Sequence, residues 1–326
     1  YDSDREYWRQ WFPADWISES FPGQFRNWFY AILAMSTVME EEPPFRLMFG
    51  YRLMKDEKGQ EMHKSKGNAV EFNQAAEQEG ADPMRWLFAA HYPEHDLWFG
   101  LNKVHEARRQ FLVFWNVFEF YQTYAQIDGF EPRTPFLPLD RRSELDRWIL
   151  CRLEMLIRSA HTHYPAYAIH LFMRDVLSFI DALSRWYLRR SRRSFWKSRK
   201  EDHKLAAYQT LWQCLQTTAQ LLAPVIPFST EHIYQQIVRR LAPEAPVSVH
   251  HTDFPKAGSL AVDEELLEGM DSVLELVELG HAARNKAQIK VRQPLPLLRL
   301  KVTDAVRAQH MQPYLDLVRE ELNVKQ

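Results

Sequence analysis

The sequence predicts a mainly helical protein with α/β parts: a partial parallel sheet, then an all-α helix bundle, then a small α/β domain. Strand-like apolar runs alternate with helical patterns up to about Gly100, which is typical of a parallel sheet. From Asn102 onward apolar residues recur at helical spacing in long segments joined by short connectors, which indicates a bundle. We therefore expect three domains, over residues 1–101, 102–256 and 257–326.

The composition indicates a folded protein without a membrane segment. The 326 residues are 46% hydrophobic and 26% charged, which favours a packed chain over a disordered one. Because the net charge is -2, any nucleic-acid contact must come from local basic patches. Cys151 and Cys214 lie in apolar helical patterns, so we expect buried, reduced thiols and no metal site. No apolar run is long enough to span a membrane and no signal peptide is recognisable, so we expect a cytoplasmic protein.

The first region is expected to alternate strands and helices. Its expected elements are a strand over 13–17, a helix over 24–39, a strand over 45–54, a helix over 71–79 ended by Gly80, and a helix begun by Asp82-Pro83. Parallel sheets bind ligands at the carboxyl ends of their strands, which is where Glu19 and Gln24 fall. Trp28 and Phe29 belong either to the core or to the same site.

A lysine-rich loop is expected between the second strand and the next helix. Asn68 and Glu71 fit the reciprocal cap of a helix start, and before them Lys64 and Lys66 flank Ser65. Ammonium groups, a hydroxyl and the free N–H groups of a helix end suit a polyanion such as a phosphate chain. The alternative is an ordinary solvated turn, because these residue types are common in loops.

The run of residues 61–68, Glu-Met-His-Lys-Ser-Lys-Gly-Asn, resembles the Lys-Met-Ser-Lys-Ser loop of class I aminoacyl-tRNA synthetases. Met62, Lys64 and Ser65 match, whereas Glu61 and His63 replace the family's first lysine and first serine. The resemblance implies that residues 1–101 are the second half of a Rossmann-like catalytic domain.

It also implies that this loop binds ATP. Lys64 and Ser65 would then be the catalytic residues, assisted by Lys66, because a loop cation stabilises the charge on reacting phosphates. Glu61 would repel phosphate unless it pairs with a loop lysine, and His63 would add charge only when protonated.

The segment after the first strand is similar to one in the isoleucine branch of the family. There a strand ends in Glu-Gly, and the next helix opens with Asp-Gln-Thr-Arg-Gly-Trp-Phe. Glu19, Gln24, Arg26, Trp28 and Phe29 match this pattern with one residue inserted, whereas Ser20, Gly23 and Asn27 depart from it. The resemblance implies that the segment holds the aminoacyl-adenylate, with one polar contact missing at Gly23. The implied ATP and adenylate contacts are Glu19, Gln24, Trp28, Met62, His63, Lys64 and Lys66.

The middle region predicts a helix bundle with one basic, aromatic stretch. Helices are expected over 104–124, 142–161, 166–190, 205–222 and 230–241. Within 184–200, eight residues are basic, and four aromatic residues are interleaved with them. Such a stretch can neutralise phosphates and stack on exposed bases. The alternative is a helix whose aromatic residues face the core and whose arginines are solvated or paired, and we expect most of the aromatic residues to follow it.

The same stretch closely resembles the isoleucyl enzymes' Trp-Tyr-Ile-Arg-Arg-Ser-Arg-Arg-Arg-Phe-Trp segment. The resemblance implies an anticodon-binding bundle. The expected tRNA contacts are Arg185, Arg189, Arg190, Arg192, Arg193, Trp196 and Lys197.

The last region predicts a small α/β junction domain. A helix over 263–286 with an interruption at Gly280, strands over 288–293 and 297–302, and a helix over 307–322 are expected. Residues 283–295 nearly repeat an isoleucyl-enzyme pattern. A surface domain without chemistry of its own is the simpler interpretation of this region.

Together these resemblances imply a piece of an isoleucine–tRNA ligase that uses ATP and Mg²⁺ in the full-length enzyme. The family's His-x-Gly-His motif, inserted editing domain and C-terminal zinc module do not occur in this sequence. We therefore expect a monomer that binds tRNA but does not catalyse alone and holds no tight cofactor. The alternative is a non-catalytic paralogue that acts as an RNA-binding or interaction protein, which the departures at Gly23, Asn27 and Glu61 favour.

Overall fold

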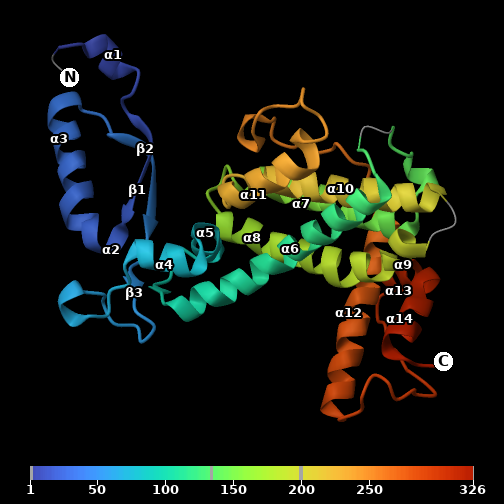
Figure 1. The fold of residues 1–326 in the computed structure, drawn as a ribbon. Coiled ribbons are helices and arrows are strands. Elements are labelled where there is room, and N and C mark those ends of the chain that lie inside the picture. The colour runs from blue at the N-terminus through green and yellow to red at the C-terminus, as the bar shows by residue number, and fades with distance from the viewer. Residues whose placement is uncertain (1–2, 133–134, 198–200, 326) are drawn as a thin grey trace. The chain divides into compact units, whose positions relative to one another are not determined.

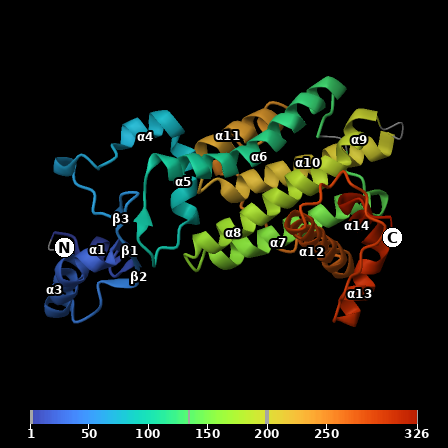
Figure 2. The ribbon, with the colours of Figure 1, turned by 90° about the horizontal axis from the view of Figure 1, so that it is seen from below.

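The computed structural model describes residues 3–132, 135–197 and 201–325 (Figures 1 and 2). The chain divides into two compact units, Tyr1–Phe111 and Leu112–Gln326, and each is described by itself. The protein is mainly helical, with small parallel sheets in the first unit.

The first unit is built around a strand–helix–strand crossover. Its elements are α1 (Arg5–Arg9), β1 (Ala14–Ser20), α2 (Phe21–Gln24), a π-helical segment (Phe25–Phe29), α3 (Tyr30–Glu40), β2 (Phe45–Tyr51), β3 (Met54–Lys55), a 3-10 turn (Lys64–Lys66), α4 (Phe72–Glu79), α5 (Ala81–Ala90), β4 (Leu97–Trp98) and the start of α6 (Leu101–Asp128). β1 pairs with β2 in parallel, from Ala14 opposite Phe45 to Ser20 opposite Tyr51, and β3 pairs with β4 in parallel. Parallel pairing is therefore present as predicted, but in two separate two-stranded sheets rather than in one sheet.

Several boundaries in this unit differ from the sequence prediction. The strand expected over 13–17 runs on to Ser20, and the helix expected over 24–39 begins at Phe21 and contains the π-helical segment Phe25–Phe29. The expected strand over 45–54 is broken between β2 and β3, because Arg52 and Leu53 turn toward Asp96, whose carboxylate accepts the Leu53 N–H at 3.2 Å. The helix expected from Asp82-Pro83 begins one residue earlier, at Ala81, after Gly80, whose φ of 94° ends α4. Asp82 lies in the first turn of α5 and is buried.

Apolar side chains of the β1–β2 sheet and of α3 remain open to solvent. Trp16 and Leu47 on the sheet are exposed, as are Leu33, Met35 and Val38 on the helix. Parallel sheets are normally covered on both faces. The core of this unit lies instead under α4 and α5, where Ala75, Met84, Phe99 and Val104 form one buried cluster.

The second unit is a helix bundle followed by a C-terminal helical segment. Its elements are the rest of α6, α7 (Glu144–His163), α8 (Ile169–Asp181), a π-helical segment (Ala182–Leu188), α9 (Arg189–Lys197), α10 (Glu201–Leu222), α11 (Pro227–Tyr234), a π-helical segment (Gln235–Arg239), α12 (Glu264–Lys286), α13 (Ala305–Met311), a 3-10 turn (Gln312–Tyr314) and α14 (Leu315–Leu322). All five bundle helices of the sequence prediction are present, and Cys151 and Cys214 are buried free thiols, as predicted.

The C-terminal segment differs most from the prediction. The two strands expected over 288–293 and 297–302 are absent. Among the described residues of this segment, the backbone pairing is a single parallel bridge between Leu295 and Val324. The helix expected over 307–322 is split by the 3-10 turn that contains Pro313. α12 runs through Gly280 without the expected interruption. A Cβ at this position would lie 2.2 Å from Leu322 Cδ1, so the glycine allows α14 to pack closely against α12.

Candidate functional site

A folded turn fixes the start of the lysine-rich loop. After β3, the Asp56 carboxylate accepts the backbone N–H groups of Lys58 and Gln60 at 2.9 and 2.8 Å, and Gly59 adopts a φ of 76°. The Asn68 side chain donates to the same carboxylate at 2.8 Å. This last hydrogen bond is the main cause that lowers the pKa of Asp56.

Asn68 does not cap a helix, which corrects the sequence prediction. Its amide oxygen accepts the His63 N–H at 2.9 Å, and its amide nitrogen also donates to the Glu61 carbonyl at 3.1 Å. Glu71 caps α4 instead, because its carboxylate accepts the Gln74 N–H at 3.0 Å. Asn68 therefore closes the loop at its base, joining the turn at Asp56 to both sides of the loop.

The tip of the loop presents unpaired cations. Lys64, Ser65 and Lys66 form a single 3-10 turn and are exposed, and among the residues described neither lysine has an ion pair. Met62 packs against the buried cluster under α4 and α5, which anchors the loop beside this tip. An exposed, anchored pair of ammonium groups can bind a phosphate chain.

The two residues that depart from the family pattern contact each other. His63 Nε2 lies 3.4 Å from Glu61 Oε2. Glu61 therefore pairs with His63 and not with Lys64 or Lys66, which leaves both lysines available.

The predicted adenylate residues lie at the carboxyl end of the sheet. Glu19 is near the end of β1, and its carboxylate accepts from Tyr51 Oη at 3.2 Å. Burial, and then the charge of Glu19, raise the pKa of Tyr51. The Gln24 side-chain oxygen accepts from Asn27 Nδ2 at 3.3 Å. Trp28 is 39% exposed, whereas Phe29 is buried, so of these two only Phe29 is a core residue.

The structure thus forms three small groups in the first unit: the loop, the Glu19–Tyr51 pair and the Gln24–Asn27 pair. No hydrogen bond or ion pair within the described part of the chain joins the loop to either pair. Sequence reasoning missed Asp56 and Tyr51. Tyr51 is the last residue of β2. A correct prediction of that strand end would have pointed to Tyr51, because ligands bind at the carboxyl ends of parallel strands.

The basic stretch divides into paired and unpaired arginines. The Arg190 guanidinium forms ion pairs with the carboxylates of Glu320 and Glu321 on α14, each at 2.6 Å. Glu321 also forms an ion pair with Arg189 at 2.7 Å. Arg185 pairs with Asp181 at 2.9 Å on the same helical face. Arg192 and Arg193 are exposed, and neither has an ion pair in the described ranges.

The aromatic residues of this stretch mostly face the core, as predicted. Trp186, Tyr187 and Phe195 are buried, and Trp196 is 48% exposed. The Arg192 guanidinium lies 5.9 Å from the Trp196 ring centroid, in the range of a cation–π contact. Arg192, Arg193 and Trp196 therefore form an exposed cationic and aromatic surface. The side chain of Lys197, the remaining expected contact, lies outside the described part of the structure.

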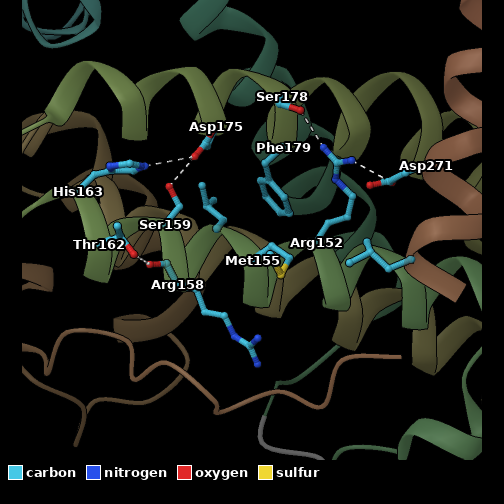
Figure 3. A pocket seen from close by; sticks show the side chains of 12 residues that line it. Arg152, Met155, Arg158, Ser159, Thr162, His163, Asp175, Ser178, Phe179 and Asp271 are labelled. Atoms are coloured by element: carbon cyan, nitrogen blue, oxygen red, sulfur yellow. Dashed lines mark hydrogen bonds and ion pairs between the residues drawn. The ribbon is translucent and has the colours of Figure 1, made fainter. Parts of the chain in front are cut away.

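A pocket of about 480 Å³ lies between α7, α8 and α12, and Figure 3 shows its lining. It contains none of the predicted site residues. Its polar groups satisfy one another: Arg152 donates to Asp271 and Ser178 at 2.9 and 2.8 Å, and Ser159 donates to Asp175 at 2.7 Å. These contacts tie three helices together and leave few free groups for a ligand.

Two classes of site have no counterpart in the described ranges. No group of three histidine, cysteine, aspartate or glutamate side chains there is placed to hold a metal ion. No helix among the described residues is both long enough and apolar enough to cross a bilayer.

Comparison with known families assigns both regions. Residues 1–98 match the family "tRNA synthetases class I (I, L, M and V)", and residues 146–300 match "Anticodon-binding domain of tRNA ligase". The chain is 40% identical over 316 residues to an isoleucine–tRNA ligase of Dehalococcoides mccartyi, and this match covers 96% of the chain and 31% of that protein. It is 39% identical to the isoleucine–tRNA ligase of Thermus thermophilus, over 98% of the chain and 31% of that protein. The chain therefore spans about a third of the length of these curated relatives.

Solved structures share the fold at low identity. Mycobacterium tuberculosis methionyl-tRNA synthetase in complex with methionyl-adenylate superposes with a TM-score of 0.57 at 20% identity, covering 78% of this chain and 52% of that one. A ternary complex of Agrobacterium radiobacter K84 LeuRS with tRNA and LeuAMS gives a TM-score of 0.58 at 16% identity, covering 78% of this chain and 29% of that one. The chain belongs to the class I tRNA synthetase family of the I, L, M and V group over residues 1–98, and to the anticodon-binding domain family of tRNA ligases over residues 146–300.

Proposed function

We propose that this chain is the part of an isoleucine–tRNA ligase that carries the second half of the catalytic domain, over residues 1–101, and the anticodon-binding bundle, over 102–256. Identity of about 40% along nearly the whole chain to proteins named isoleucine–tRNA ligase is the observation that carries the proposal. The full reaction joins isoleucine to AMP from ATP, releases pyrophosphate, and passes the isoleucyl group to tRNA.

Lys64 is the proposed catalytic residue of the loop, with Ser65 and Lys66 beside it. Its exposed ammonium group has no competing carboxylate among the described residues, because Glu61 faces His63. Such a cation stabilises the negative charge that spreads over the phosphates as pyrophosphate leaves. Glu19, Gln24 and Trp28 are the proposed contacts to the adenylate, together with Met62 and His63 from the loop. In our proposal Mg²⁺ arrives on the phosphates of ATP, as is common for this ion.

The second unit is the proposed tRNA reader. Arg192, Arg193 and Trp196 are the side chains best placed to contact RNA, because they are exposed and carry no ion pair in the described part. Arg185 and Arg189 are exposed, but each already has an ion pair with a carboxylate, so RNA would have to compete with that carboxylate for the guanidinium. Arg190 stays in the proposed set as a residue that contacts RNA only if α14 releases it. Lys197 completes the set.

Binding of isoleucine tRNA to this chain tests the proposal. We expect the double change Arg192→Glu and Arg193→Glu to weaken binding, and to reduce the slope of log K against log salt by about one per lost phosphate contact. Arg174→Glu is the matched control, because Arg174 is an exposed arginine on α8 outside the stretch. Equal loss in both variants, or in neither, would contradict the assignment of the interface.

A second function remains in view: a non-catalytic paralogue that binds RNA. Gly23 and Asn27 occupy positions where the family pattern has other residues, and Asn27 bonds to Gln24 rather than leaving it free. If the protein is the enzyme, Lys64 contributes to the rate of adenylate formation. If it is a non-catalytic paralogue, substitution of Lys64 has no effect on any such rate. In either case we propose a cytoplasmic monomer.

A further inference from the structure

A cavity of about 180 Å³ lies in the second unit, between the last turns of α6 and the π-helical segment Gln235–Arg239. It shares no lining residue with the pocket of Figure 3. Its volume is below the roughly 300–1,000 Å³ of pockets for drug-sized ligands, so it admits about one ring system. Its wall includes a phenol, a phenyl ring, two amides, a carboxylate and a guanidinium, which belong to Tyr121, Phe130, Gln122, Gln236, Glu131 and Arg240.

The hydroxyl of Tyr121 is buried without a hydrogen-bond partner in the described part of the chain. Tyr121 lies on α6, is 2% exposed and lines the cavity. Burial above all, and then the charge of Tyr208, raise the pKa of Tyr121, so the hydroxyl stays protonated and can donate. Buried polar groups in folded proteins nearly always have a partner, and leaving one unpaired lowers stability. A ligand in the cavity can supply such a partner.

Two glutamines on the wall bond to each other and keep further polar atoms for a ligand. Gln122 Nε2 donates to Gln236 Oε1 at 3.1 Å. Gln122 Oε1 and Gln236 Nε2 have no partner among the described residues, so the pair offers an acceptor and a donor close together. Such a pair matches a base edge that carries one donor and one acceptor, and glutamine pairs with adenine in this way.

The end of α6 holds Phe130 in place beside the cavity. Gly129 adopts a φ of 63°, and the Phe130 N–H donates to the Ala125 carbonyl at 2.9 Å, which is the geometry of a Schellman helix end. Tyr208 stacks on Phe130, with ring centroids 5.1 Å apart and planes at 17°. Since Phe130 also lines the cavity, a planar base can continue this stack on the face that Tyr208 leaves free.

Arg240 and Glu131 bring opposite charges to the same wall without pairing. Both residues are exposed, and neither has an ion pair within the described ranges. A guanidinium binds phosphate through several N–H groups, and a carboxylate accepts from ribose hydroxyls in nucleotide sites. Together with the amides and the ring, the cavity therefore carries a group for each part of a nucleotide.

We propose that this cavity binds one adenine nucleotide, either free or unpaired within an RNA strand. The base stacks on Phe130 and pairs with the two amides. The Tyr121 hydroxyl donates to the ligand, the Arg240 guanidinium binds the phosphate, and Glu131 accepts from the ribose. The arginines of α9 do not line this cavity, so this proposal and the proposed RNA surface on α9 can each fail while the other holds.

Titration of the chain with AMP, followed by NMR, tests the proposal. The side-chain amide signals of Gln122 and Gln236 report on the cavity itself and not on the lysine-rich loop of the first unit. We expect both signals to shift with AMP and to move much less with UMP at the same concentration, because the amide pair selects the base. Gln309→Ala is the matched control, because Gln309 is an exposed glutamine on α13 outside the cavity lining, and this variant should bind AMP as the unchanged chain does.

Tyr121→Phe separates a ligand contact from a structural role. We expect AMP binding to weaken by about three- to tenfold, since one hydrogen bond to the ligand is lost. The free energy of unfolding should stay the same or rise, because the substitution removes a buried polar group without a partner in the described structure. A variant that lost stability and binding together would show that the hydroxyl serves the fold, and this would overturn the proposal.

Arg240→Ala tests the phosphate contact. AMP should bind the unchanged chain about tenfold more tightly than adenosine does, and the variant should bind the two equally. A short unpaired oligoadenylate that binds more tightly than AMP assigns the cavity to RNA, whereas equal affinities assign it to free nucleotides. No shift of the two amide signals with AMP or oligoadenylate, equal shifts with UMP, or an unaltered preference for AMP in the Arg240→Ala variant would overturn the proposal.

Discussion

Arg190 of the basic helix and Glu321 of the C-terminal helix form an ion pair that is largely removed from solvent. Arg190 Nη1 lies 2.6 Å from Glu321 Oε1, and their side chains are 17% and 9% exposed. The same guanidinium lies 5.5 Å from the ring centroid of the buried Trp186. One of the arginines expected at an RNA surface thus joins α14 to the bundle.

Removal of this carboxylate is expected to destabilise the second unit. Glu321→Gln leaves the half-buried, charged Arg190 with only the exposed Glu320 as an acidic partner among the described residues, so the cost should approach but not exceed the roughly 3–5 kcal/mol of breaking a fully buried pair. Glu320→Gln is the matched control, because Glu320 is 65% exposed, and surface pairs contribute less than about 1 kcal/mol. Urea unfolding of both variants measures the difference. Equal free energies of unfolding would show that the pair does not hold α14 in place.

The amide of Asn68 is expected to control both the acidity of Asp56 and the mobility of the loop. Since its hydrogen bond is the main cause of the lowered pKa of Asp56, Asn68→Ala should raise that pKa toward its ordinary value of about 3.9. A carboxylate whose pKa is lower in the folded state than in the unfolded state stabilises the fold at pH values above its unfolded-state pKa. This stabilisation is lost as the pH falls through its folded-state pKa. The native loop should therefore loosen below about pH 4, and the variant should already be loose at neutral pH.

Two measurements check this prediction. Carboxyl NMR titration reports the pKa of Asp56, and limited trypsin digestion after Lys64 and Lys66 reports loop opening at neutral pH. Asn73→Ala is the control, because the side chain of Asn73, on α4, bonds to the exposed cap residue Glu71 and to no other described residue. An unchanged pKa together with unchanged cleavage would remove Asn68 from this role.

Lys64 is expected to act on rate more than on substrate affinity. In a longer form of the protein that holds the complete catalytic domain, Lys64→Ala should lower kcat for ATP–pyrophosphate exchange by about 10²–10³, the usual effect of losing one transition-state contact. Lys58→Ala is the control, because Lys58 is an exposed lysine in the adjoining turn. A change in KM alone would assign Lys64 to ground-state binding, and no change in either constant would favour the paralogue.

The elements were largely predictable from the sequence, and the tertiary partners were not. The capping pattern of Asn68 and Glu71 is local, so the sequence favoured it, but Asn68 is held by Asp56 from the turn before the loop. Arg190 finds its acids 130 and 131 residues further along the chain, beyond the reach of any local pattern. Residues 297–302 carry the alternation of a strand, but a strand requires a neighbour, and alternation does not supply one.

Two glycines of α12 yield a ranked prediction about packing. Alanine favours a helix interior over glycine by about 1 kcal/mol, so each Gly→Ala change gains that amount before packing is considered. At Gly269 a new Cβ would lie 2.3 Å from the His310 carbonyl oxygen of α13, which is backbone and cannot rotate away. At Gly280 it would lie 2.2 Å from Leu322 Cδ1, the far end of a side chain that can adopt another rotamer.

Overpacking of a rigid contact costs about 1–3 kcal/mol and more when backbone must shift, so it outweighs the helix gain at Gly269. We expect Gly269→Ala to lower the free energy of unfolding by about 1–3 kcal/mol. Gly280→Ala should cost less, because movement of Leu322 relieves the contact. Glu278→Ala, a neighbouring change on the same helix that introduces no new contact, serves as the reference in the same urea titration. If Gly280→Ala proved the more damaging substitution, the contact of α12 with α14 would be the more rigid of the two.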